Sequence, residues 1–257
     1  MQNDNAKSKI LIANWKAHPE TIDLAKDLFT LELEVAQKHP TVQVIICPPT
    51  HWLSELSALY ADRMTLQFAL GAQDVFWKFG EENYGVKYVL VGHSDRRYPT
   101  RATPEAATRR EEGEGDTDKV VNQKIKIALE SGVTPVLLVG ERNKGDNRQA
   151  VIEQQLTLGL AGLSAEMLEK VMIAYEPVWA ISTNPNAEPD TSENTLQAAK
   201  IIENITGKKT ILYGGSVNET NITDFLSHSQ ISGAVIGRAS LRPEQWGEML
   251  AKVAKIH

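Results

Sequence analysis

Short apolar runs alternate with amphipathic segments along the chain, and this alternation limits the possible fold more than any other feature. Each apolar run has the length and composition of a strand that is buried on both faces. The predicted strands cover residues 9–13, 42–47, 64–69, 88–91, 135–139, 171–175, 210–213 and 234–236. The predicted helices include residues 21–38, 118–130, 147–158, 192–204 and 219–226. This order is typical of an α/β protein with a parallel sheet.

The number of repeats narrows the architecture further. In residues 21–38 the apolar side chains recur every three or four positions, as they do on the buried face of a helix. Eight strand and helix units fit a closed (β/α)8 barrel with its helices outside. A doubly wound open sheet is the alternative that the pattern alone leaves open. At 257 residues the chain suits one large domain, so we expect a single domain over residues 1–257.

The composition argues against several classes of protein. The formal net charge is −6, whereas a sequence-independent nucleic-acid binder needs a basic surface. The single cysteine, Cys47, rules out an internal disulfide, and its apolar surroundings predict a buried, unreactive thiol. No apolar stretch is long enough to cross a membrane, and residues 1–9 are polar without a signal-peptide core. We therefore expect a cytoplasmic protein.

Glu176 marks the point where the chain leaves a predicted strand for a loop. It follows the apolar run 171–175, and the proline after it favours an extended backbone. Residues 177–179 are stiff, whereas residues 182–184 are small and polar, as in a lid with a rigid hinge. The carboxyl ends of barrel strands carry active sites, so Glu176 is a candidate catalytic group. An ordinary surface carboxylate is the alternative.

Three further motifs directly follow predicted strands. They are residues 13–16 (ANWK), residues 91–97 (VGHSDRR) and residues 212–218 (LYGGSVN). Together with residues 174–181 (AYEPVWAI), they resemble the motifs of the triosephosphate isomerase family and stand in the family's order. The resemblance extends from about residue 10 to about residue 246.

This resemblance implies a (β/α)8 TIM barrel with a known chemistry. The family interconverts dihydroxyacetone phosphate and glyceraldehyde 3-phosphate, in glycolysis and gluconeogenesis, without a metal or organic cofactor. Glu176 would move a proton between adjacent carbons through an enediolate. His93 would polarise the carbonyl as a neutral imidazole, and this family is itself the usual illustration of that role. Asn14 and Lys16 stand on alternate positions, so both would point into the barrel mouth and stabilise negative charge.

The resemblance also assigns the phosphate group to backbone amides. One loop contains Gly215 and Ser216, and a second begins with Gly237 and Arg238 after the last strand. Ser182, in the lid, would add an amide when the lid closes. The expected partner is therefore the triose phosphate substrate, with no nucleic acid and no membrane.

Some residues depart from the family pattern. Asp95 replaces a glutamate and is one methylene shorter, so we expect a looser link to Lys16 or to the path of the proton. Ser182 and Asn184 replace the two glycines of the lid, and we expect the lid to close more slowly. Arg238 replaces a glycine in the last phosphate loop, which constrains the backbone but keeps its amide.

Two connections also depart in length. Residues 75–87 leave no room for a full helix, although the family has a longer excursion there that reaches into a partner subunit. Residues 98–118 form a longer loop than usual, and we expect them to cover the surface that the short connection exposes. The family is usually a homodimer, so we expect a monomer or a differently assembled dimer.

Three alternatives to an active isomerase remain at this point. A degenerate paralogue would bind sugar phosphates without efficient turnover. Another phosphate-binding barrel, such as an indole- or ribulose-phosphate enzyme, would share the phosphate loops but not the full set of motifs. A scaffold protein would leave the clustering of polar residues at strand ends without a reason.

Overall fold

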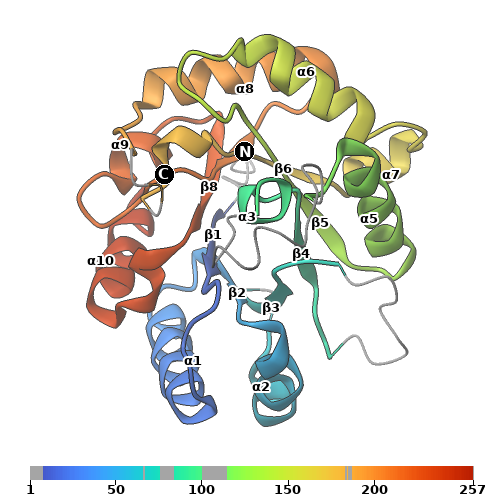
Figure 1. Ribbon diagram of the computed structural model, residues 1–257. Coiled ribbons are helices and arrows are strands. Elements are labelled where there is room, and N and C mark those ends of the chain that lie inside the picture. The colour runs from blue at the N-terminus through green and yellow to red at the C-terminus, as the bar shows by residue number, and fades with distance from the viewer. Residues whose placement is uncertain are drawn as a thin grey trace, which may run out of the picture.

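Eight parallel strands close into a barrel in chain order, because β1 pairs with both β2 and β8. The computed structural model describes residues 8–65, 67–75, 84–99, 115–182, 184 and 187–256. The strands are β1 Lys9–Asn14, β2 Val42–Cys47, β3 Phe68–Ala72, β4 Tyr88–Val91, β5 Thr134–Val139, β6 Met172–Tyr175, β7 Ile211–Tyr213 and β8 Ile231–Ile236. The predicted (β/α)8 barrel is confirmed, and the doubly wound open sheet is excluded (Figure 1).

Helices ring the strands on the outside of the barrel (Figure 1). In the described part of the chain they are α1 Ile22–Gln37, α2 Leu53–Tyr60, α3 Ser94–Arg97, α5 Asp118–Glu130, α6 Arg148–Gly159, α7 Ala165–Glu169, α8 Ser192–Thr206, α9 Ile222–Leu226 and α10 Pro243–Val253. Short 3-10 turns cover Thr50–Trp52, Ala61–Arg63, Val178–Ala180 and Arg238–Leu241. Several helices begin at a capping side chain that accepts a hydrogen bond from the amide three residues further on: Thr21, Thr117, Asn147, Ser164 and Thr191.

The predicted strand at residues 64–69 is wrong in its position. The hydroxyl of Thr65 accepts hydrogen bonds from the amides of Gln67 and Phe68, which turns the chain before β3 can begin. Helices α2, α7 and α10 were not predicted. The last of these carries Pro243 at its start, a position that proline favours.

Two apolar layers hold the barrel together. The inner layer fills the barrel itself and consists of Ile12, Ile45, Cys47, Leu90, Val136, Leu138, Ala174, Leu212 and Val235. The larger outer layer lies between strands and helices and includes the fully buried Trp15 and Trp246. The predicted burial of Cys47 is confirmed, and burial raises the pKa of its thiol. Alternate residues of each strand supply the two layers.

A buried carboxylate lies within the outer layer. The Trp15 indole packs between the strands and α1 and donates a hydrogen bond to Glu32 Oε1 at 2.9 Å. Glu32 is fully buried in α1, and its second oxygen has no partner in the described part of the protein. Burial raises the pKa of Glu32 well above its ordinary value, against the opposing effect of the Trp15 hydrogen bond.

Glu32 should make the protein less stable as the pH rises. Its pKa is higher in the folded than in the unfolded chain. Its contribution to the free energy of unfolding is therefore complete below about pH 4.5 and is lost as the pH rises through the pKa of the folded group. The substitution Glu32→Gln keeps an acceptor for Trp15 and removes this titration. Between about pH 5 and about pH 8 the variant should gain ~1 kcal/mol or more in unfolding free energy relative to the parent. Urea unfolding at both pH values measures this, and a pH-independent difference would contradict it.

The connection between β3 and β4 is short. Its described residues, 73–75 and 84–87, contain no helix, and the absence of a full helix from the whole connection stays a prediction. Residues 76–83 and 100–114 lie outside the described residues, and with them most of the long loop predicted after the fourth strand and the surface it is expected to cover. Across the described ranges, no helix combines the length and apolar character needed to cross a bilayer.

Candidate active site

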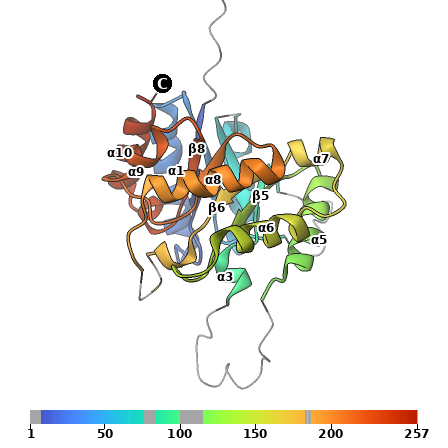
Figure 2. The same ribbon diagram turned by 90° about the horizontal axis from the view of Figure 1, so that it is seen from above.

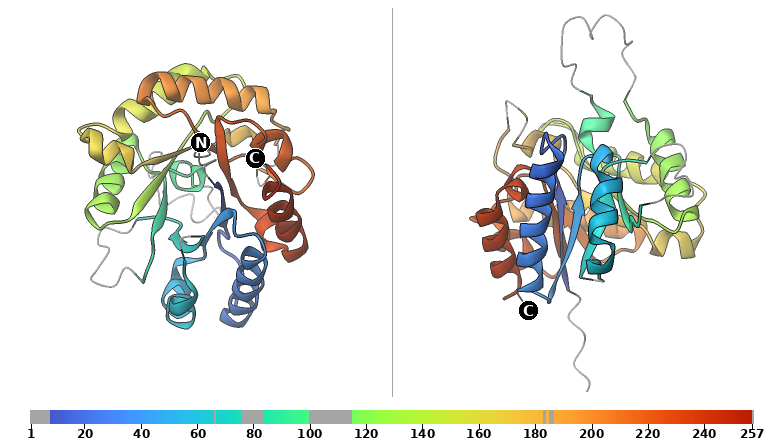
Figure 3. Two further views of the ribbon diagram at one scale, coloured as in Figure 1. Left: turned by 180° about the vertical axis from the view of Figure 1, so that it is seen from behind. Right: turned by 90° about the horizontal axis from the view of Figure 1, so that it is seen from below.

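The predicted site residues meet at the end of the barrel where the strands finish. Helix α3, which follows β4, projects from this end, whereas the C-terminus lies at the other (Figures 2 and 3). A cavity of about 210 Å³ opens here, the volume of about seven water molecules. Its lining includes every residue predicted for the site, namely Asn14, Lys16, His93, Glu176, Ser182, Gly215, Ser216, Gly237 and Arg238.

The side chains of His93 and Glu176 lie in contact within the lining of the cavity. The Nε2 atom of His93 lies 3.1 Å from Oε1 of Glu176. The Nδ1 atom of His93 accepts a hydrogen bond from the Asp95 amide at 3.0 Å, so Nδ1 carries no proton. The ring is therefore a neutral imidazole whose Nε2–H group points toward the carboxylate.

Glu176 is buried and held by the first residue of α3. Its carboxylate accepts hydrogen bonds from the Ser94 amide at 2.8 Å and from the Ser94 hydroxyl at 3.3 Å. Burial raises the pKa of Glu176, while His93, the Ser94 amide and Lys16 act in the opposite direction. A carboxylate with a raised pKa is a stronger base. Glu176 therefore has the surroundings that a proton-abstracting group requires.

Lys16 reaches the cavity from a strained backbone. Its φ angle of 54° is in the left-handed region, which costs a non-glycine residue roughly 1–3 kcal/mol. The Asn14 side chain accepts a hydrogen bond from the Lys16 amide at 3.0 Å, and Gln73 donates to the Lys16 carbonyl at 2.7 Å. The Lys16 ammonium pairs with Asp95 at 3.0 Å, so the expected loosening of this link is not observed.

The loop after β7 offers backbone donors to the cavity. The amides of Gly215 and Ser216 find no acceptor among the residues that the structure describes, whereas the Gly214 amide donates to the Tyr175 carbonyl at 2.7 Å. A Cβ atom on Gly215 would overlap the Tyr213 hydroxyl, so only glycine fits there. Unpaired amides beside a lysine favour an anion.

The turn after β8, the strand that pairs with β7, also lines this cavity. The 3-10 turn Arg238–Leu241 begins there, and the first amides of a helical turn have no acceptor within it. Ser240 holds the turn through two hydrogen bonds to the Gly237 carbonyl, from its amide at 2.9 Å and its hydroxyl at 2.8 Å. Arg242 and Gln245 also line the cavity and were not predicted from the sequence. Their place just beyond the phosphate turn is the signal that could have found them.

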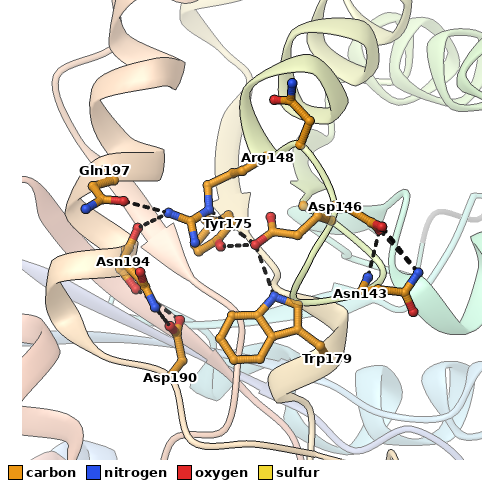
Figure 4. A network of polar contacts seen from close by, with 12 residues as sticks. Asn143, Asp146, Arg148, Tyr175, Trp179, Asp190, Asn194 and Gln197 are labelled. Carbon is orange, nitrogen blue, oxygen red and sulfur yellow. Dashed lines mark hydrogen bonds and ion pairs between the residues drawn. The ribbon is translucent and has the colours of Figure 1, made fainter.

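Glu141 fixes the hinge of the lid, and it too was not predicted. Its Oε1 atom accepts hydrogen bonds from the Tyr175 hydroxyl at 2.8 Å and the Trp179 indole at 3.0 Å. The Nε atom of Arg148 lies 3.2 Å from the same oxygen. Figure 4 shows Tyr175, Trp179 and Arg148 converging from different elements. A charged residue just past the end of β5 is the sequence signal that could have revealed Glu141.

The predicted lid also contacts the loop after β7. The Ser216 hydroxyl donates to the Ala180 carbonyl at 2.5 Å, which joins the loop after β7 to the base of the lid. Ser182 and Asn184 lie within the described chain, whereas residues 183, 185 and 186 lie outside it. The predicted slower closure of the lid stays a prediction.

The fold and the site together define a class of protein. A closed (β/α)8 barrel that places a buried carboxylate, a neutral imidazole and an anion-binding cavity at the carboxyl ends of its strands is the scaffold of an acid–base enzyme for small phosphorylated substrates. The family model described as triosephosphate isomerase matches residues 9–253. The chain belongs to the triosephosphate isomerase family.

Individual relatives agree with this assignment over nearly their whole length. The triosephosphate isomerase of Dictyoglomus thermophilum is 36% identical over 264 aligned residues, which cover 93% of this chain and 97% of that protein. The triosephosphate isomerase of Aquifex aeolicus is 33% identical, with 94% of this chain and 98% of that protein covered. The triosephosphate isomerase of Carboxydothermus hydrogenoformans is 35% identical, with 93% and 96% covered.

Proposed function

We propose that this protein interconverts dihydroxyacetone phosphate and D-glyceraldehyde 3-phosphate by proton transfer through an enediolate. The observation that carries the proposal is the 3.1 Å approach of a neutral His93 N–H group to the buried Glu176 carboxylate, in a cavity lined by unpaired amides. Membership of the triosephosphate isomerase family supports the identity of the substrate.

Glu176 is the proposed base. It removes a proton from the carbon beside the carbonyl and returns it to the neighbouring carbon, so one carboxylate serves both half-reactions. In the structure its oxygens are occupied by Ser94, so the substrate has to replace at least one of those hydrogen bonds. The Ser94 contacts keep the carboxylate oriented until the substrate arrives.

His93, Lys16 and Asn14 are the proposed stabilisers of the enediolate. The Nε2–H group of His93 donates to the substrate oxygen, which becomes more negative as the proton leaves. The Lys16 ammonium supplies positive charge at the same end of the barrel, and the Asn14 side chain fixes the Lys16 backbone. These groups are in place before reaction, so they stabilise the developing charge with little rearrangement.

Backbone amides are the proposed grip on the phosphate. They come from Gly215 and Ser216 on one side, from Gly237 and Arg238 on the other, and from Ser182 when the lid closes. Lid closure expels water, which strengthens the electrostatic contacts and protects the enediolate from losing phosphate.

A coupled assay in both directions tests this proposal. The purified protein should turn over glyceraldehyde 3-phosphate and dihydroxyacetone phosphate with a kcat of at least ~1 s⁻¹, the lower end of the usual range for enzymes. Binding of the substrate without turnover would instead identify a catalytically impaired paralogue, which the Asp95 and lid replacements first suggested.

We also propose a monomer, or a dimer that differs from the family's usual homodimer. β3 ends at residue 72 and β4 begins at residue 88, so only fifteen residues connect them, fewer than the family's usual excursion into a partner subunit. Sedimentation at micromolar concentration tests this, and a tight dimer with residues 73–75 in its interface would contradict it. The cytoplasmic location expected from the sequence stays a prediction.

A further inference from the structure

Two arginine side chains line the phosphate end of the cavity without an assigned role. Arg238 opens the 3-10 turn after β8, and Arg242 follows that turn directly at the start of α10. Both side chains are exposed, and both border the same cavity as Lys16, Gly215 and Ser216. One turn of backbone therefore brings two guanidinium groups to the same cavity as the unpaired amides.

Neither guanidinium group has a hydrogen-bond or ion-pair partner among the residues that the structure describes. Other arginines on the same rim differ, because Arg96, Arg97 and Arg148 each pair with a carboxylate. The structure therefore leaves Arg238 and Arg242 available to an external anion.

Positively charged side chains outnumber negatively charged ones in the lining of the cavity. Its lining contains a single carboxylate, Glu176, and three cationic side chains, Lys16, Arg238 and Arg242. The chain as a whole carries a formal net charge of −6, so this positive end is a local exception. A concave positive region on an acidic protein attracts a small dianion and guides it to the site.

The turn that carries the arginines is held firmly in place. Ser240 is fully buried and bonds twice to the Gly237 carbonyl, and the Trp246 amide donates to the Arg242 carbonyl at 2.9 Å. A Cβ atom on Gly237 would lie 3.8 Å from Cε of Lys16, so the lysine stem runs beside the start of this turn. The backbone that presents the guanidinium groups is therefore ordered before a ligand binds.

We propose that Arg238 and Arg242 form a side-chain clamp that grips the substrate phosphate from the solvent side of the cavity. This inference rests on the proposed isomerase function. A planar guanidinium group matches a pair of phosphate oxygens and donates two parallel hydrogen bonds. The clamp adds side-chain charge to the backbone amides, and it makes the site selective for a dianionic phosphate over an uncharged sugar.

The clamp has a definite kinetic signature. The phosphate group does not change during the reaction, so the arginines bind the substrate and the transition state about equally. Such binding lowers KM and leaves kcat nearly unchanged. Residues that contact the reacting carbons would change kcat instead.

Glutamine substitutions test the clamp by removing charge at similar length. Arg238→Gln and Arg242→Gln should each raise KM about tenfold, with kcat changed less than about threefold. The double variant should raise KM further and flatten the dependence of kcat/KM on ionic strength. Arg63→Gln is the matched control, because Arg63 ends a turn before β3 at the opposite end of the barrel, and its kinetics should match the parent.

Inorganic phosphate provides a readout that needs no turnover. By isothermal titration calorimetry, the double glutamine variant should bind phosphate at least about tenfold more weakly than the parent. The variant with lysine at both positions keeps the charge but loses the paired donors, so its phosphate affinity should lie between that of the parent and that of the double glutamine variant. If the arginine stems had only a structural role, phosphate affinity would not follow the charge at these positions. The lysine variant also serves if the glutamine pair does not fold.

The two readouts separate the clamp from the isomerase function. Turnover by the parent with unchanged KM and phosphate affinity in the double variant would overturn the clamp alone. A parent without turnover, whose phosphate affinity still depends on both arginines, would overturn the isomerase function and keep the clamp.

Discussion

Replacing Glu176 by glutamine should lower kcat by about a hundred- to ten-thousand-fold, the usual contribution of general base catalysis. The amide has the shape of the carboxylate and an oxygen that can accept from Ser94, so the site should keep its geometry. It has no basic oxygen that can take a proton from carbon. The coupled isomerase assay measures the loss, and calorimetry should show that affinity for inorganic phosphate is retained.

A matched control and a pH profile sharpen this test. Glu166→Gln changes the same type of side chain on α7, where Glu166 is exposed and pairs with Lys170, and it should leave kcat unchanged. Burial raises the pKa of Glu176, so kcat/KM of the parent should begin to fall on acidification at a pH above 4.5. A Glu176→Gln variant with parental kcat would remove the basis for the proposed mechanism.

Replacing Lys16 by methionine should lower kcat/KM by about a hundred- to a thousandfold, the cost of losing one donor at a site of developing negative charge. Methionine keeps the stem that runs beside Gly237 and removes only the ammonium. Asp95 loses its partner but is about half exposed, so water can solvate it. The loss should appear in both kcat and KM, because the ammonium serves the enediolate and the phosphate.

Lys170→Met is the control for this second experiment. Lys170 is exposed beside Glu166 before β6, at the far end of the barrel from the cavity, and its loss should not change either constant. If Lys16→Met raised KM alone, the ammonium would be only a phosphate ligand, and the proposed stabilisation of the enediolate would be wrong.

The periodicity of the sequence predicted the strands better than it predicted their closure. Apolar runs such as residues 42–47 and 88–91 coincide with β2 and β4, because a strand buried on both faces carries apolar side chains at most of its positions. Closure depends on β1 pairing with β8, a contact between chain ends that no local pattern records. The barrel was therefore favoured over an open sheet only by the family resemblance.

The residues of the candidate site likewise include some that local sequence patterns predicted and some that they did not. Asn14, His93 and Glu176 were found because each lies at or just beyond the end of a strand, and a barrel of parallel strands brings these ends together. Glu141 and Arg242 were missed because their importance depends on contacts between distant segments. Glu141 meets Trp179 from 38 positions away, and only the folded chain brings the two together.

The Glu141 contacts couple the lid to the outer ring of helices. Arg148, the first residue of α6, bonds both to Glu141 and to the side chain of Gln197 in α8 (Figure 4). The Trp179 indole donates a hydrogen bond to the same Glu141 oxygen. A movement of the lid that breaks this bond would therefore also affect the contact between α6 and α8. We therefore expect the base of the lid and the contact between α6 and α8 to move together when the lid closes.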